Sequence, residues 1–259
     1  MVKLTALARR AFESVRRSSL WDDQEPIREE LFSVERLEQH ARSLALAQIV
    51  SSRTSRGQPL ARRLADNDAV LLKAYLSNVE AINEGRAITP AAEWLVDNYH
   101  LVEKQIRELR SDLPPGYYRQ LPKLASGPFA GYPRVFGMAW AFVAHTDSRF
   151  DSEMLIRYVR AYQEVQPLTI GELWAVSITL RIVLVENLGR LGRQITQSRA
   201  ARTVADGLAD RLLGTGGRPA ESVAVVLFAH ERAPLSDALA VQLVHRLGDQ
   251  DPRITPALT

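Results

Sequence analysis

The chain has 259 residues, of which 46% are hydrophobic and 24% charged, and its formal net charge is +3. These values are those of an ordinary globular protein and exclude a disordered chain. Because the sequence contains no cysteine, disulfides, thiolate metal ligands and cysteine nucleophiles are excluded. Only four of the 33 basic residues are lysine, and no recognised nucleic-acid module accompanies them, so we expect no nucleic-acid partner.

Residues 1–26 are predicted to form a basic amphipathic helix and a linker. Apolar residues recur there at helical spacing between basic side chains: Leu4, Leu7, Ala8, Ala11, Phe12 and Val15. Such a helix suits docking on its own domain, and it also suits a weak contact with an anionic membrane surface. Arg9 and Arg10 interrupt the first apolar run too early for a secretory signal.

Three further helices are predicted before the middle of the chain. The first covers residues 33–50, with Ser33 as a favourable N-cap. After a Ser/Thr/Arg/Gly loop at 51–59, the second covers 60–84 and stops at Gly85, a residue type that commonly ends helices. In the third, at 89–110, Thr89 is the cap and Pro90 takes the first helical position.

Residues 112–151 form a block of unusual composition. They hold five of the 13 prolines and four of the 14 glycines, together with many aromatic residues. A Pro-rich backbone cannot repeat helical hydrogen bonds, so specific contacts must order this block. One helix is expected inside it, from about residue 133 to residue 145.

The remaining chain is again predicted to be helical. Asp147 or Asp151 can cap a helix that ends before Pro167. Thr169 and Glu172 then form a capping box at the start of the most apolar helix, which we expect to be central and buried. The glycines at 214–217 mark a boundary, and shorter helices are expected at 220–230 and 236–247.

These elements predict an all-α fold, because no strand-like alternation of apolar and polar residues occurs. We expect a multi-helix bundle or a layered helical array, with one irregular Pro/Gly/aromatic block and a small C-terminal helical extension. The predicted divisions are the N-terminal helix and linker at 1–26, the main helical domain at 27–213 and the extension at 214–259. The apolar stretch 173–185 contains Arg181 and is shorter than the ~20 residues that span a bilayer.

Two Asp-x-Asp pairs resemble the metal-binding acids of nucleotide-sugar transferases. These are Asp66/Asp68, inside a predicted helix, and Asp249/Asp251, in a Pro-flanked turn. Neither follows a strand, so we interpret both as caps or solvated charges. The histidines show no metal-ligand or catalytic spacing. We therefore expect no catalytic residue, no cofactor and no metal in this chain.

A second set of residues offers a candidate contact surface. Arg181 lies on an apolar helix and needs a partner, which is either an internal acid or an anionic ligand. Aromatic faces and hydrogen-bonding groups in the irregular block suit either a glycan contact or an interdomain contact. The candidate contact residues are Tyr117, Tyr118, Arg119, Arg134, Trp140, His145, Asp147, Arg149 and Arg181.

Four long blocks of the sequence are similar to the N-terminal region of bacterial cyclic β-1,2-glucan synthases. They are residues 21–45, 88–124, 131–151 and 162–188. The resemblance implies a part of a very large inner-membrane enzyme that builds β-1,2-glucan from UDP-glucose, trims it with a phosphorylase-like domain and releases a ring. In that family the transferase motifs and the membrane helices lie beyond this stretch, and no Arg-Trp pair of the acceptor motif occurs here.

The resemblance therefore implies a helical module that is a truncated or split piece of such a synthase and is not active alone. Its partner would be the remainder of the synthase, in cis or in trans, and its location would be the cytoplasmic face of the inner membrane. The alternative is a free-standing helical protein that binds glucan or nucleotide sugar. A membrane-surface adaptor that acts through the first helix is a third hypothesis.

Overall fold

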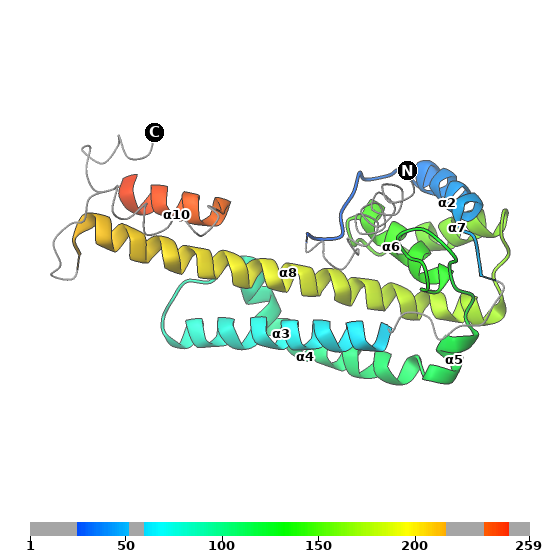
Figure 1. Cartoon of the computed structure of the whole chain (residues 1–259), viewed down its shortest axis with the longest axis horizontal. Coiled ribbons are helices and arrows are strands. Elements are labelled where there is room, and N and C mark those ends of the chain that lie inside the picture. Colours follow the sequence, from blue (N-terminus) through cyan, green and yellow to red (C-terminus); the bar gives the residue numbers. More distant parts are fainter. Residues whose placement is uncertain (1–24, 52–59, 216–235, 249–259) are drawn as a thin grey trace, which may run out of the picture. The chain divides into compact units, whose positions relative to one another are not determined.

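The computed structural model describes residues 25–51, 60–215 and 236–248 (Figure 1). Within these ranges every regular element is a helix, and the only β-pairing consists of isolated bridges, Val50 with Leu124 and Lys123 with Pro133. The all-α prediction is thus confirmed. The helices are α2 (Val34–Ala47), α3 (Leu60–Asn83), α4 (Pro90–Asp112), α5 (Pro115–Gln120), α6 (Arg134–Thr146), α7 (Ser152–Gln163), α8 (Ile170–Leu213) and α10 (Asp237–Gly248).

The chain divides into two compact units, Met1–Gly192 and Arg193–Thr259. In the first unit the middle of α8 contacts both α3 and α4, and α3 packs along α4. The helices α2 and α7 pack together beside α6 (Figure 1). In the second unit α10 packs on the end of α8, where Gln242 donates to Asp206 and Arg246 to Asp210. The predicted division at 26 and 213 stays a prediction, and the helices expected at 4–15 and 220–230 lie outside the described residues.

Helix starts follow the predicted caps. The Ser33 hydroxyl accepts a hydrogen bond from the backbone N–H of Arg36 at 3.3 Å. The Thr89 hydroxyl likewise accepts from the N–H of Ala92 at 3.3 Å, with Pro90 at the first helical position. Each cap satisfies an N–H that has no partner inside its helix, and this fixes where the helix begins.

The helix α8 begins with the predicted capping box. The N–H of Thr169 donates to Glu172 Oε2 at 2.9 Å, and the N–H of Glu172 donates to Thr169 Oγ1 at 3.2 Å. Of the two predicted caps for α7, Asp151 is the N-cap and accepts from the N–H of Met154. Asp147 instead ends α6 in the left-handed region, at φ 51°.

The core of the first unit surrounds α6. Nearly every residue of α6 is buried, including Val135, Phe136, Phe142 and Val143. The expectation that α8 is the central buried helix was right only for its middle turns, because Trp174 is 74% exposed. The physical reason is register: Arg63, near the start of α3, contacts Glu186, so the first turns of α8 extend beyond α3.

Candidate functional site

The nine predicted contact residues lie on four parts of the first unit. Tyr117, Tyr118 and Arg119 are on α5, whereas Arg134, Trp140 and His145 are on α6. Asp147 and Arg149 follow α6, and Arg181 is on α8. Tyr118, Arg134, Trp140 and His145 are buried, while Arg119 and Arg149 are exposed. The set therefore does not present one continuous surface.

Arg134 and Glu172 form a buried ion pair. The guanidinium Nε donates to Glu172 Oε1 at 2.5 Å and Nη2 donates to Oε2 at 2.8 Å. Further bonds run from Arg134 to Gln166 Oε1 and to the carbonyl of Pro167. The hydrogen bond to Glu172 raises the pKa of Arg134 above its ordinary value. The pair joins the first residue of α6 to the first turn of α8, so Arg134 is committed to internal bonding.

Lys123 fixes the chain that follows α5. Its ammonium donates to the carbonyls of Tyr118 at 2.5 Å and Leu121 at 2.6 Å, and it lies 4.5 Å from the centre of the Tyr118 ring. The side chain is buried, and this burial lowers the pKa of Lys123 to about 8. Lys123 was not among the predicted residues, although a lysine inside an aromatic block signals a specific contact.

The Gln48 side chain closes the same region from α2. Gln48 Oε1 accepts from the Tyr162 hydroxyl at 2.7 Å, and its carbonyl accepts from Gln166 Nε2 at 3.1 Å. A Cβ added at Gly137 would lie 2.8 Å from Gln48 Nε2. A larger residue at this position of α6 would force the end of the Gln48 side chain to shift. Internal contacts of this kind are what order the irregular block.

A second buried polar group, the α8 ionic cluster, comprises Arg63, Asn67, Glu186 and Arg190. Glu186 is 1% exposed and accepts from Arg63 Nε at 2.7 Å, Asn67 Nδ2 at 2.6 Å and Arg190 Nε at 3.1 Å. Burial alone would raise the pKa of Glu186, but the hydrogen bonds from Arg63 and Asn67 lower it below its ordinary value.

Arg190 extends the α8 ionic cluster to α6 and to the chain before α2. Its guanidinium lies 5.0 Å from the Trp140 ring centre, and Nη1 donates to the carbonyl of Glu25 at 2.7 Å. We did not predict this cluster from the sequence. The available signal was a pair of opposite charges, Glu186 and Arg190, four residues apart in an apolar helix.

His145 belongs to a cluster that also contains Phe32, His40 and Glu29. The His145 ring stacks on Phe32 at 3.8 Å between centres and meets His40 edge-on at 4.7 Å. Its Nδ1 lies 2.8 Å from the carbonyl of Glu30, and its Nε2 lies 3.3 Å from a carboxylate oxygen of Glu29. Burial and the neighbouring His145 lower the pKa of His40 below its ordinary value.

Two other predicted residues have acidic or basic partners inside the protein. Arg181 pairs with Asp112 and lies 3.7 Å from Glu108 Oε2, as the internal ion-pair alternative predicted. Asp147 accepts from Arg28 Nη2 at 2.7 Å. These contacts join α8 to α4 and the chain before α2 to the end of α6.

The described residues contain no group of three or more His, Asp or Glu side chains that could hold a metal ion. Asp68 accepts from Arg110 Nη2 at 2.5 Å, and Asp66 is exposed. The pair Asp249/Asp251 lies outside the described residues.

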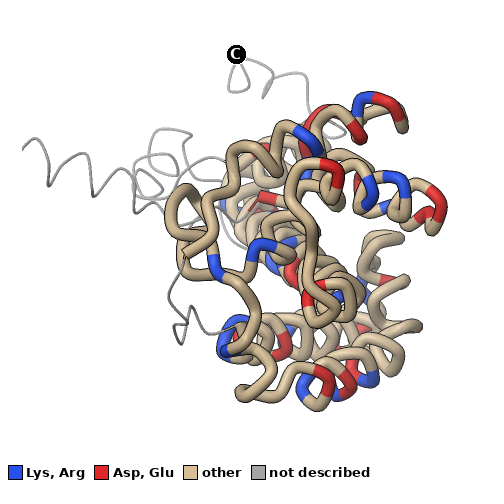
Figure 2. The backbone as a smooth tube through the Cα atoms, turned by 90° about the vertical axis from the view of Figure 1, so that its right-hand side faces the viewer, with Lys and Arg blue, Asp and Glu red and all other residues tan. Residues whose placement is uncertain are grey.

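No helix in the described ranges is long and apolar enough to cross a membrane. Basic and acidic positions are interspersed along the described helices (Figure 2).

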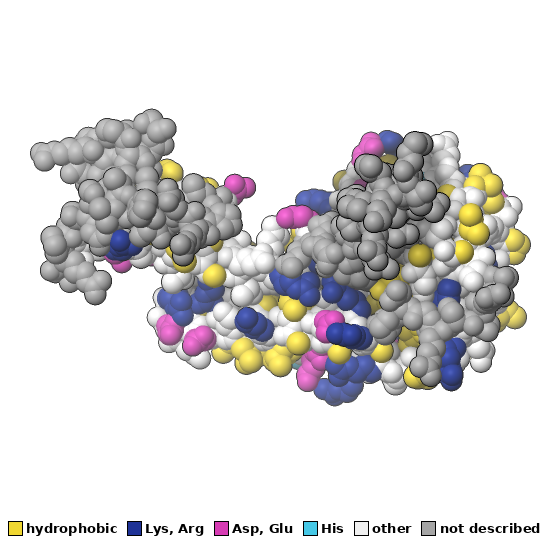
Figure 3. Space-filling view, viewed as in Figure 1, with side chains coloured by type: hydrophobic (Ala, Val, Ile, Leu, Met, Phe, Trp, Pro, Cys, Tyr) yellow, Lys and Arg dark blue, Asp and Glu magenta, His cyan; other side chains and the backbone are white. Residues whose placement is uncertain are grey.

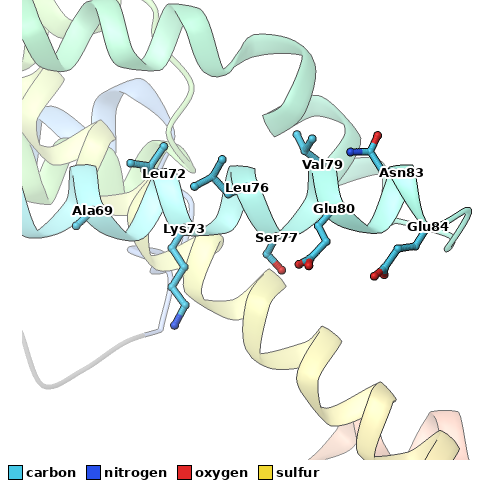
Figure 4. A pocket seen from close by; sticks show the side chains of 9 residues that line it. All are labelled: Ala69, Leu72, Lys73, Leu76, Ser77, Val79, Glu80, Asn83 and Glu84. Carbon is cyan, nitrogen blue, oxygen red and sulfur yellow. The ribbon is translucent and has the colours of Figure 1, made fainter.

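A shallow groove runs along α3, with a volume of about 830 Å³ (Figure 4). Figure 3 shows hydrophobic side chains gathered along the lower edge of the molecule, where Figure 1 places α3 and α4. The groove is lined by Ala69, Leu72, Lys73, Leu76, Ser77, Val79, Glu80, Asn83 and Glu84. Its lining is mixed, since Leu72 and Leu76 are exposed apolar residues and Lys73 and Glu80 are charged.

A comparison with curated proteins finds a relative of this chain. Over 188 residues, which are 72% of this chain, the sequence is 39% identical to the cyclic beta-(1,2)-glucan synthase NdvB of Rhizobium meliloti strain 1021. The matched part is only 6% of that protein's length. No family model matches the chain. The resemblance seen in the sequence is thus confirmed: the chain is related to a segment of a cyclic β-1,2-glucan synthase.

Proposed function

We propose that this chain is a non-catalytic helical module of a cyclic β-1,2-glucan synthase, acting at the cytoplasmic face of the bacterial inner membrane. In this role it supports the synthesis of cyclic β-1,2-glucan from UDP-glucose by packing against the catalytic and membrane parts. The observation that carries the proposal is the 39% identity over 188 residues to a segment that is 6% of a far longer synthase.

The packing of the candidate contact residues agrees with a supporting role. Arg134 and His145 are buried and bonded inside the first unit, and Trp140 is buried beside the guanidinium of Arg190. Buried ion pairs of this kind fix the arrangement of helices and offer little surface to a ligand. A rigid scaffold is what a docking module needs, because preorganised surfaces lose less conformational entropy on binding.

A chimera tests the proposal directly. The segment of NdvB that matches this chain is replaced by the corresponding residues of the chain, and cyclic β-1,2-glucan is quantified in the producing cells. We expect the chimera to restore glucan to at least about half of the native level, since a related fold should present a similar surface. A synthase that lacks the segment should produce little glucan, and full production without the segment would refute a supporting role.

The purified chain gives the second arm of the test. Incubated with UDP-glucose, it should transfer no glucose to glucan, and titration calorimetry with β-1,2-glucan or UDP-glucose should show no heat of binding. Glucose transfer would contradict the non-catalytic proposal. Saturable binding of either ligand would favour the alternative of a free-standing binding protein.

A further inference from the structure

The helix α3 carries two apolar stripes on different faces. The inner stripe is buried and consists of Leu60, Leu64, Leu71, Ala74 and Ala81. The outer stripe is spaced alternately by four and three residues and consists of Ala65, Ala69, Leu72, Leu76 and Val79. Alternation of four and three residues is the spacing of a coiled-coil seam.

The described part of the chain covers the outer stripe only in part: Val79 is half-buried, and the other four residues are exposed. Leu72 is 43% exposed and Leu76 is 55% exposed, and both line the groove along α3. A surface helix normally has one apolar stripe, which faces its own core. A second stripe with the regular spacing of a seam therefore indicates that another helix packs there.

Charged residues flank the outer stripe at one coiled-coil position. Asp66, Lys73 and Glu80 are each seven residues apart and all are exposed. In Figure 4 the Leu72 and Leu76 side chains leave α3 on one side of the view and the Lys73 and Glu80 side chains on the other, and all four line the groove. Within the described ranges these three charges make no hydrogen bond or ion pair. Residues at this position set the choice of partner in coiled coils, and their order here is acidic, basic, acidic.

The flanking charges disfavour antiparallel pairing with a second copy of this chain. The antiparallel pairing that sets Leu72 against Leu76 of the second copy also brings Lys73 close to Lys73 of that copy. The same register brings Asp66 close to Glu80 of the second copy. Like charges at such positions are destabilising. The register that pairs the leucines of two copies is therefore the register that brings their like charges together.

We propose that the outer stripe of α3 binds an amphipathic helix from another part of the synthase, with a four-three apolar seam flanked by basic, acidic and basic residues in that order. The source of the helix rests on the proposed function, because the related synthase extends far beyond the matched segment. The sequence pattern of the helix follows from α3 alone. The order of charges reads the same in both directions, so it holds for parallel and antiparallel docking.

Two synthetic peptides of three heptads provide the probe. Both peptides carry leucine at the seam positions. In the first peptide the charged residues on each side of the seam are Lys, Glu and Lys in that order, and in the second they are Glu, Lys and Glu. Binding to the full 259-residue chain is measured by fluorescence anisotropy at low salt. We expect the first peptide to bind about ten-fold more tightly than the second, because three favourable pairs replace three repulsive ones.

Substitutions locate the site. Leu76→Glu should weaken binding of the first peptide at least about ten-fold, because a charge then lies in the apolar seam. Leu101→Glu, at a leucine of similar exposure on α4, is the matched control and should leave binding unchanged. Circular dichroism should show that both variants keep the helical content of the native chain.

Three results would overturn the inference: equal affinity for the two peptides, binding that survives Leu76→Glu, or self-association of the native chain in sedimentation that Leu76→Glu abolishes. The last result would assign the stripe to a second copy. These outcomes are separate from the glucan assay of the chimera. A functional chimera with no peptide binding would remove only the α3 site and leave the supporting role in place.

Discussion

Arg63 on α3 and Glu186 on α8 form a two-point ion pair, with Nε to Oε2 at 2.7 Å and Nη2 to Oε1 at 2.5 Å. The Glu186 carboxylate is 1% exposed, and the Arg63 side chain is 16% exposed. Desolvation of the two charges offsets much of their attraction, so the pair mainly specifies which helices pack together. Removing one partner leaves the other charge buried and uncompensated, and this makes the pair testable.

Glu186→Gln should lower the free energy of unfolding by about 3 kcal/mol at neutral pH, because the Arg63 and Arg190 guanidinium groups lose their buried counter-charge. Urea denaturation measures the difference. The pKa of Glu186 is held below its ordinary value, so its stabilising contribution is lost as the pH falls through that lowered value. The difference between the two proteins should therefore shrink in acid.

The control for this substitution is Glu80→Gln, at an exposed carboxylate on α3. It should change the free energy of unfolding by less than about 0.5 kcal/mol, since surface changes away from specific contacts are nearly neutral. Equal effects of the two substitutions would show that the α8 ionic cluster does not hold α3 against α8.

Gly189→Ala should destabilise the protein, whereas Gly192→Ala should not. A Cβ at Gly189 would lie 2.7 Å from Asn67 Oδ1, but one at Gly192 would lie an ordinary 3.4 Å from a Leu71 methyl carbon. Overpacking costs about 1–3 kcal/mol, and alanine in place of glycine in a helix gains up to about 1 kcal/mol. Thermal unfolding should thus separate the two variants in opposite directions.

A second substitution tests the cause of the Gly189→Ala effect. Asn67→Ser shortens the side chain that the new methyl group would meet, so the double variant should be more stable than the sum of the single effects predicts. Strict additivity would mean that the steric contact with Asn67 is not the reason for the loss.

The sequence was sufficient for features that depend on neighbouring residues. Ser33, Thr89 and the Thr169–Glu172 box act within four residues of where they stand, so residue type and spacing were enough to place three helix starts. An internal acid was also one of the two partners predicted for Arg181, because an arginine on an apolar helix must be paired.

Contacts between distant segments could not be foreseen in the same way. Arg63 and Glu186 are 123 residues apart, and Ile27 N–H donates to Asn187 Oδ1 across 160 residues. No local sequence pattern predicts which of the many charged residues will form an ion pair with each other. The short helix α5 was missed as well, because a Pro-rich block favours irregular backbone and six residues carry no helical period.

Lys123→Met should remove a rise in stability with pH. Burial lowers the pKa of Lys123 to about 8 in the folded protein, and the unfolded chain has the ordinary value of about 10.4. Between these values the unfolded state binds more protons, so the free energy of unfolding increases with pH, in total by about 3 kcal/mol. The variant should lack this slope.

Urea denaturation from pH 8 to about 9.5 measures the slope below the range in which tyrosines titrate. Lys104→Met, at an exposed lysine on α4, is the matched control and should keep the native slope. A native protein whose stability is flat over this range would show that the two carbonyls and the Tyr118 ring stabilise the Lys123 ammonium enough to cancel its desolvation.

His40 should make the protein less stable in mild acid. Burial and the adjacent His145 ring lower the pKa of His40 below its ordinary value, and the negative charge of Glu29 offsets part of this. Because the unfolded chain binds the proton more readily, stability falls as the pH drops from the ordinary histidine value toward the lowered one. His40→Gln removes the titrating group, so the unfolding free energy of this variant should depend less on pH. The range to measure is roughly pH 7.5 to 5, because the ordinary histidine pKa is about 6.5.

The control is His100→Gln, at an exposed histidine on α4, which should retain the native pH dependence. If His40→Gln and the native protein lose stability in parallel, the acid sensitivity arises elsewhere, and the contact between the two imidazole rings has no part in it.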